Sequence, residues 1–240
     1  RMKHFKQPWF WLLIICILLL WVDPVYAGPG GAIAKGLFKS WWGKILLSLI
    51  VIILLPLFFY VKIVETLKVR KNKKILTQLS VKHPDFAWIK LQKVFTNSIQ
   101  RVYHAWSNED LQEVKNYVNH WYWQNQQEVF INQWKRENLK NVSSLKRISA
   151  IRPMYMELTE DLEGSRIAVA IDVEAEDYLK DLQTGKIVQG KSGVQDLNYI
   201  WFFEYTEGKW LLDEIQEGSF SLGLAKLPNV VSPALGLQTA

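Results

Sequence analysis

The stretch from Ile45 to Val61 limits most strongly what this 240-residue chain can form. It contains no charged residue, one serine and one proline. A run of this kind is at the short end of what crosses a bilayer, and the long side chain of Lys62 can reach the interface so that the run extends to Val64. Aromatic residues flank both ends, as in the interfacial belts of membrane spans. The sequence predicts a transmembrane helix over residues 45–64; a buried core helix is the weaker alternative.

The segment before this run has the pattern of a secretory signal. Residues 1–27 contain three basic residues within the first six positions, an apolar stretch over residues 9–22 and a cleavage-site pattern that ends at Ala27. An uncleaved first membrane span is the alternative. Residues 28–44 begin with a Gly-rich stretch and continue with apolar, aromatic and basic residues, which predicts a flexible and partly interfacial linker.

The distribution of basic residues predicts how the transmembrane helix is oriented in the membrane. The net charge is +6, and basic residues are concentrated directly after the apolar run. The side with more lysine and arginine is normally cytoplasmic. Residues 65–75 are therefore expected to be a basic juxtamembrane segment on the cytoplasmic side of a bacterial or organellar inner membrane. The basic residues of this segment are a topology signal, and we also expect them to bind anionic lipid headgroups. They are Lys68, Arg70, Lys71, Lys73 and Lys74.

Residues 76–218 show helical periodicity first and strand alternation later. Apolar residues recur every three or four positions from Phe86 to Trp106, and two further helices are expected, to about Trp121 and about Leu139. Alternation then predicts strands, in which Ala168 and Ala170 fall on the polar side. This order predicts an α+β domain, in which helices pack on an antiparallel sheet.

Two further features complete the chain. Residues 219–240 lack periodicity, so we expect a C-terminal tail. The one cysteine, Cys16, lies in the first apolar stretch, so the domain has no disulfide, which fits a reducing compartment.

Several motifs of the domain resemble a known family. They are the helix start His83-Pro84-Asp85-Phe86, the pair Ala105-Trp106 before an acidic cap, and the strand-turn-strand from Trp201 to Ile215. In this order they resemble the TIM forty-four-like domain, which includes the matrix-side subunit of the mitochondrial presequence translocase and membrane-anchored bacterial relatives. The resemblance covers roughly residues 76–218. Glu204-Tyr205 departs from it, because many members have a basic residue there.

The resemblance implies a cone-shaped, nuclear-transport-factor-two-like domain, in which a curved sheet and helices surround an apolar pocket. Six apolar and aromatic residues are expected to line this pocket: Phe95, Ile99, Trp106, Tyr199, Trp201 and Phe203. The function expected is that of a non-enzymatic scaffold, which recruits protein clients or assembly partners to the inner membrane. Its partners would be other membrane or translocating proteins and anionic lipids.

Other function classes find less support. Some cone-shaped domains are enzymes with an acid or a histidine in the pocket, so His104 is a candidate for its edge, whereas Asp172 and Glu174 fall on the polar face of their strand. The sequence has no metal-binding, phosphate-loop or nucleophile motif, which predicts neither metal nor cofactor. Aromatic residues interleaved with basic ones around Trp134 are better explained by a helix pair than by binding to nucleic acid or the ribosome. A tethered small-molecule-binding or enzymatic domain and a secretion-system assembly component remain the alternatives.

Overall fold

The computed structural model describes residues 40–237. The expected signal segment (1–27) and most of the expected linker (28–44) lie outside the described residues. The chain divides into two compact units, Arg1–Ile63 and Val64–Ala240.

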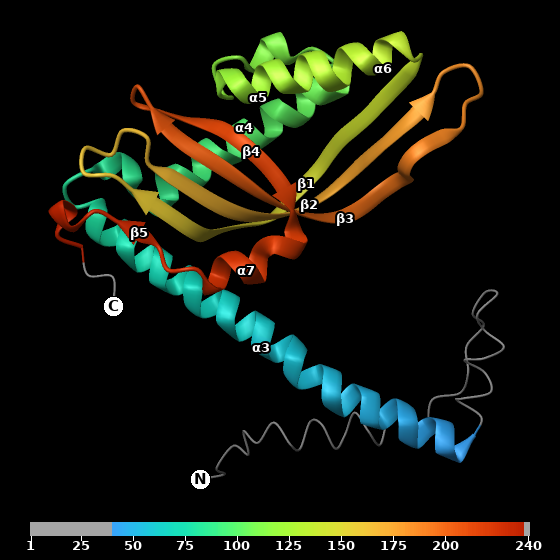
Figure 1. Cartoon of the computed structure of the whole chain (residues 1–240), viewed down its shortest axis with the longest axis horizontal. Coiled ribbons are helices and arrows are strands. Elements are labelled where there is room, and N and C mark those ends of the chain that lie inside the picture. The colour runs from blue at the N-terminus through green and yellow to red at the C-terminus, as the bar shows by residue number, and fades with distance from the viewer. Residues whose placement is uncertain (1–39, 238–240) are drawn as a thin grey trace. The chain divides into compact units, whose positions relative to one another are not determined.

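The apolar run lies in one helix, α3 (Trp41–Leu79), which contains Pro56 (Figure 1). By length and composition this helix could cross a membrane, and its most apolar window is not buried. Its 39 residues correspond to about 58 Å, nearly twice the thickness of a hydrocarbon core. The helix therefore continues without a break through the basic segment expected over residues 65–75, and its last part, from Val64, belongs to the second unit.

The second unit is built on a five-stranded sheet in the order β4-β3-β2-β1-β5. The strands are β1 (Leu139–Leu158), β2 (Arg166–Asp181), β3 (Ile187–Thr206), β4 (Lys209–Glu217) and β5 (Val230–Val231). The first four are antiparallel neighbours, joined between β3 and β4 by the expected tight turn, in which Glu207 and Gly208 both have positive φ. The α+β class is confirmed, but the sheet is mixed, because β5 pairs parallel with β1.

Helix α4 (Trp88–Asn108) covers one face of this sheet, after the short helix η1 (Pro84–Phe86). Phe95 of α4 stacks on Phe203 of β3, with 4.2 Å between the ring centroids. The alternating residues Ile167, Val169 and Ile171 of β2 are fully buried in the same core. The helical period expected for α4 and the alternation expected for β2 are thus confirmed, because the apolar residues of both lie in one core.

The opposite face of the sheet is covered as well, by the second part of α3 and by α7 (Ser221–Lys226) (Figure 1). Ala168 and Ala170 of β2 are buried there, so the expectation that they lie on a polar, solvated side is wrong. Their small side chains let the covering helices approach closely, and β2 is therefore buried on both faces.

The segment after α4 differs from the expected helices. A short η2 (Leu111–Val114) is followed by Val118, which forms a bridge to β4, and only then by α5 (His120–Asn125). The backbone N–H of Asn119 donates to the carbonyl of Leu212, and this pairing with β4 interrupts the helical period. The last expected helix ends earlier, through η3 (Gln126–Ile131) and α6 (Asn132–Arg136), because Leu139 already begins β1.

The expected tail folds back on the domain. It contains η4 (Gly218–Phe220), α7, β5 and η5 (Pro233–Leu235). Besides the parallel pairing of β5 with β1, the N–H of Ser232 donates to the carbonyl of Leu158 at 2.8 Å. The expectation of a tail is wrong for these residues. The cone shape that the resemblance implies stays a prediction.

Candidate functional site

A cavity of about 850 Å³ is lined by residues of α4, of the α5–η3–α6 segment and of the sheet. These elements can be followed in Figure 1. Its lining comes from α4 (Val102, Tyr103, Trp106), from α5 to α6 (Trp121, Tyr122, Asn125, Gln126, Phe130, Trp134) and from the strands (Asn141, Ser143, Asp177, Tyr178, Leu179, Gln189, Gly190, Tyr199, Trp201, Asp213, Glu214, Ile215). The volume is in the range of pockets that bind a ligand of drug size.

Nine of the 21 described residues that line the cavity are aromatic, and we call these nine the aromatic wall. Trp106 of α4 meets Trp134 of α6, with 5.6 Å between ring centroids, and Tyr103 lies nearly parallel to Trp201, with 6.4 Å between ring centroids. Trp121 is 66% exposed, so the aromatic lining continues to the protein surface. Aromatic pairs of this kind supply much contact area in a fixed geometry.

The six residues predicted for the pocket separate into two groups. Trp106, Tyr199 and Trp201 line the cavity. Phe95, Ile99 and Phe203 are fully buried in the adjacent core and do not line it. All six lie on the same side of the sheet, and periodicity alone could not separate wall from core. That the cavity binds a partner stays a prediction.

Trp134 and Asp177 are two of the cavity residues that sequence reasoning missed. Trp134 was expected to pack within a helix pair, but the α5–η3–α6 segment carries its aromatic side chains over the sheet. Asp177 follows the buried residues Val173 and Ala175 at intervals of two along β2. The strand alternation therefore contained the signal that this carboxylate shares the inner face.

The charges of the cavity are all of one sign. Among the described residues, its lining includes Asp177, Asp213 and Glu214 but no lysine, arginine or histidine. Asp213 is compensated, because it forms an ion pair with Arg166. Asp177 instead accepts a hydrogen bond from the Tyr199 hydroxyl at 3.1 Å.

Removal from water shifts the pKa values of several groups in the cavity lining. The side chain of Asp177 is exposed at the cavity mouth, but desolvation by the surrounding protein raises its pKa, an effect that the hydrogen bond from Tyr199 opposes. Burial also raises the pKa of Tyr103, of Tyr122 and of Tyr199. The three phenols are therefore neutral at physiological pH and can act as hydrogen-bond donors.

His104 does not line this cavity. It is exposed, with Nε2 3.2 Å from Asn108 Nδ2 and 3.7 Å from a Glu113 carboxylate oxygen. The expectation that it edges the pocket is wrong. Within residues 40–237 there is also no group of three or more histidine, cysteine or acidic residues arranged to hold a metal ion.

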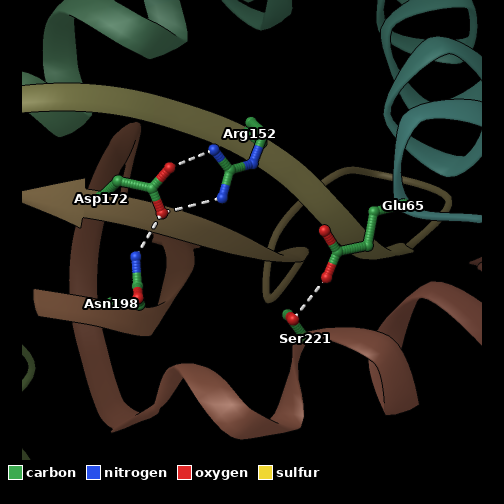
Figure 2. A network of polar contacts seen from close by, with 5 residues as sticks. All are labelled: Glu65, Arg152, Asp172, Asn198 and Ser221. Carbon is green, nitrogen blue, oxygen red and sulfur yellow. Dashed lines mark hydrogen bonds and ion pairs between the residues drawn. The ribbon is translucent and has the colours of Figure 1, made fainter. Parts of the chain in front are cut away.

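A polar network lies on the opposite face of the sheet (Figure 2). Arg152 of β1 holds Asp172 of β2 with both guanidinium branches, and Asn198 of β3 donates to the same carboxylate at 2.8 Å. Glu65 of α3 accepts a hydrogen bond from Ser221 of α7 at 2.6 Å. The hydrogen bonds to Asp172, more than the nearby charge of Glu65, raise the pKa of Arg152 against the effect of burial.

Two more polar residues of α3 attach it to the rest of the unit. The amide of Asn72 donates to the carbonyl of Pro153 at 3.0 Å and accepts from Asn229 at 2.7 Å. The ammonium of Lys68 donates to the carbonyl of Leu227. Together with Glu65 these buried groups recur at three- and four-residue spacing, so one side of the helix is a docking face.

Comparison with known proteins identifies the family. The family model described as the Tim44-like domain matches residues 73–217, more than half of the chain. The chain belongs to the Tim44-like domain family. This confirms the resemblance seen in the sequence.

A structural comparison returns the intermembrane space region of the chloroplast protein ARC6 with a TM-score of 0.37 and 10% identity, covering 53% of this chain and 92% of that chain. The search of curated proteins found no match. In this Tim44-like protein the polar residues of α3 at positions 65, 68 and 72, as well as α7 and β5, lie outside the matched residues.

The basic residues of α3 differ in accessibility. Lys68 is buried, 5.9 Å from the centre of the Tyr155 ring, and burial together with the charge of Lys71 lowers the pKa of Lys68. The expectation that it faces lipid is therefore wrong. The other four cations of the set are exposed: Arg70, Lys71, Lys73 and Lys74.

Neutralising these four exposed residues with glutamine is expected to weaken binding of residues 64–240 to vesicles that contain anionic lipid. Each basic residue near such a surface contributes about 1 kcal/mol, so the quadruple variant should lose a large part of its affinity, and added salt should have a similar effect on the unmodified protein. Co-sedimentation with vesicles measures the bound fraction.

A variant with equal charge loss provides the control. Lys93, Lys146, Lys186 and Lys191 are exposed on other elements of the unit, and replacing them with glutamine should change vesicle binding much less. Equal losses in the two quadruple variants, or equal binding to neutral and anionic vesicles, would show that the basic residues of α3 serve only as a topology signal.

Proposed function

We propose that this Tim44-like protein is a membrane-anchored, non-enzymatic scaffold that recruits protein clients or assembly partners to the inner membrane, with its Tim44-like domain on the cytoplasmic side. Tim44-like domains are associated with scaffolding in protein translocation, are generally non-catalytic and interact with proteins and membranes. Helix α3 supports the anchoring, because it is long and apolar enough to cross a bilayer.

The cavity is the observation that carries the proposal. Its aromatic wall reaches the surface at Trp121 and at Phe130, both of which are exposed. Exposed aromatic residues beside a concave apolar site are typical of protein-binding hot spots. The surface around the cavity therefore suits a protein segment that places apolar side chains between α6 and the sheet.

A photo-reactive amino acid at position 121 tests this proposal in native membranes. We expect crosslinks to one or a few discrete proteins, because the side chain lies at the cavity mouth and should touch any client bound there. Mass spectrometry of the purified adducts identifies what was captured. An additional Trp106→Ala substitution should reduce these adducts, since it removes part of the cavity wall.

The matched control carries the photo-reactive group at Val81, which is 83% exposed and does not line the cavity. Adducts common to positions 81 and 121 indicate random collisions. If position 121 yields no protein adduct beyond those of position 81, the scaffold proposal is wrong. Adducts with small molecules alone would favour a small-molecule-binding domain instead.

A reporter fusion tests the proposed orientation of the domain relative to the membrane. A reporter that is active only outside the cytoplasm should be silent when fused after Ala240, because the basic residues that follow the apolar run favour the cytoplasmic side. The same reporter fused after Lys44, before the apolar run, should be active. Strong activity of the fusion after Ala240 would place the domain outside and favour a secretion-system component.

A further inference from the structure

Asp177 differs from three other acidic residues of the sheet, which are paired with arginines. Asp172 and Glu174 of β2 each form an ion pair with an arginine of the adjacent strand β1, and Asp213 of β4 forms one with Arg166 of β2. Among the described residues 40–237, Asp177 forms none, and its hydrogen bond comes from the neutral hydroxyl of Tyr199. Its register partner on β3 is Lys191, which neither lines the cavity nor forms an ion pair with it.

The aromatic wall next to this carboxylate is also without a cation. Elsewhere the protein covers aromatic faces with its own basic side chains: Lys73 lies 5.5 Å from the ring centre of Trp88, and Arg101 lies 4.7 Å from that of Tyr117. Within the described residues no such contact involves the cavity aromatics. Aromatic faces attract a cation that comes within about 6 Å of the ring centre.

These two features restrict the ligand by charge. An anionic group would meet three carboxylates and no base in the cavity lining. A purely apolar group would cover Asp177 without giving its charge a partner, which is unfavourable. A cationic group can donate a charge-assisted hydrogen bond to Asp177 while its hydrocarbon part packs on the aromatic wall.

We propose that the cavity binds the lysine or arginine side chain of an otherwise apolar segment of a partner protein, with Asp177 as the acceptor of its charge. This inference rests on the proposed scaffold function and specifies the client that the cavity selects. The cavity of about 850 Å³ is larger than one side chain, and its lining includes the exposed apolar residues Trp121 and Phe130. A peptide segment fills both the cavity and its apolar margin, whereas a small organic cation fills only part of the cavity.

Binding of matched peptides to the full-length protein in nanodiscs of neutral phosphatidylcholine tests this proposal. The probe is a fluorescein-labelled 12-residue peptide of leucine, alanine and glutamine with one central arginine, and the comparison peptide has citrulline, which has the same shape but no charge. Fluorescence anisotropy, corrected with empty nanodiscs, gives the dissociation constants. We expect the arginine peptide to bind at least about tenfold more tightly, as befits a charged hydrogen bond.

The Asp177→Asn variant should reduce binding of the arginine peptide by about the same factor and leave the citrulline peptide unchanged. Asparagine can still accept the hydrogen bond from Tyr199, so the fold should be retained, which circular dichroism checks. Asp196→Asn is the matched control, because this exposed acid lies on β3 outside the cavity, and it should leave both affinities unchanged.

Several results would overturn the inference. Equal affinity of the arginine and citrulline peptides, insensitivity to Asp177→Asn, tighter binding of a glutamate peptide, or no binding of the arginine peptide would each exclude selection of a cation. Free agmatine that binds as tightly as the arginine peptide would exclude a protein segment. None of these results touches the scaffold proposal, which the crosslinks from position 121 decide separately.

Discussion

Replacing Trp201 with alanine is expected to lower the free energy of unfolding of residues 64–240 by about 3–5 kcal/mol, as for other large buried aromatic residues. The sequence alone allows two results, a loss of this size for a core residue or a smaller loss for a cavity wall. Trp201 lines the cavity, but it is only 2% exposed and packs against Tyr103 and Phe203. Nearly all of its surface therefore has protein neighbours to lose.

Urea unfolding followed by circular dichroism measures this difference. Trp121→Ala is the control, because Trp121 also lines the cavity but is 66% exposed, and its removal should change the stability by no more than about 0.5 kcal/mol. Because a loss of 3–5 kcal/mol is a large part of a typical total of about 5–15 kcal/mol, the Trp201→Ala variant should also lose its partners. A stability loss below about 1 kcal/mol would contradict the core role.

The fragment of residues 76–218, which the sequence suggests as the domain, is expected to lack a cooperative unfolding transition, whereas residues 64–240 should show one. The shorter fragment loses Ile75, Asn72 and the part of α3 before them, together with α7 and β5. The outer face of the sheet, with Ala168 and Ile200, would then be exposed. The fragment loses the buried Ile75 and uncovers Met154 and Ile200, and burial of each such large side chain contributes about 2–5 kcal/mol, so the combined loss is comparable to a typical total stability.

Thermal melts of both fragments test this expectation, and fragments 64–218 and 76–240 separate the contributions of α7 with β5 from that of α3. A point variant gives an independent measure. Asn72→Ala leaves the carbonyl of Pro153 and the amide of Asn229 without their partner, which costs about 1–3 kcal/mol for each buried group. If fragment 76–218 unfolds cooperatively at the same temperature as 64–240, the covering segments are dispensable.

Local sequence patterns were enough to predict the features that repeat along the chain. The uncharged run around Pro56 is visible without any structure, because membrane insertion depends on composition over about 20 residues. The helix that contains Phe95 and the strand that contains Val169 each follow a period set by backbone geometry. The ordered motifs of the domain were enough to indicate the Tim44-like family, which the family comparison confirmed.

The candidate site was predictable only in part. That Trp106 and Trp201 share one side with Phe95 followed from their periods and the resemblance. Which of them borders the cavity depends on the place of the α5–η3–α6 segment over the sheet. The same segment begins later in the chain than the sequence predicts, because the backbone of Asn119 is hydrogen-bonded to β4, which is far away in sequence.

The role of the two ends of the domain depends on contacts between residues that are far apart in sequence. Glu65, Lys68 and Asn72 are bonded to residues of the C-terminal segment that lie 156, 159 and 157 positions away. A polar residue on a helix has no local signal that distinguishes a solvated side chain from a buried one with a distant partner. Strand β5 could not be predicted from sequence periodicity either, because it has two residues and forms by pairing with the distant strand β1.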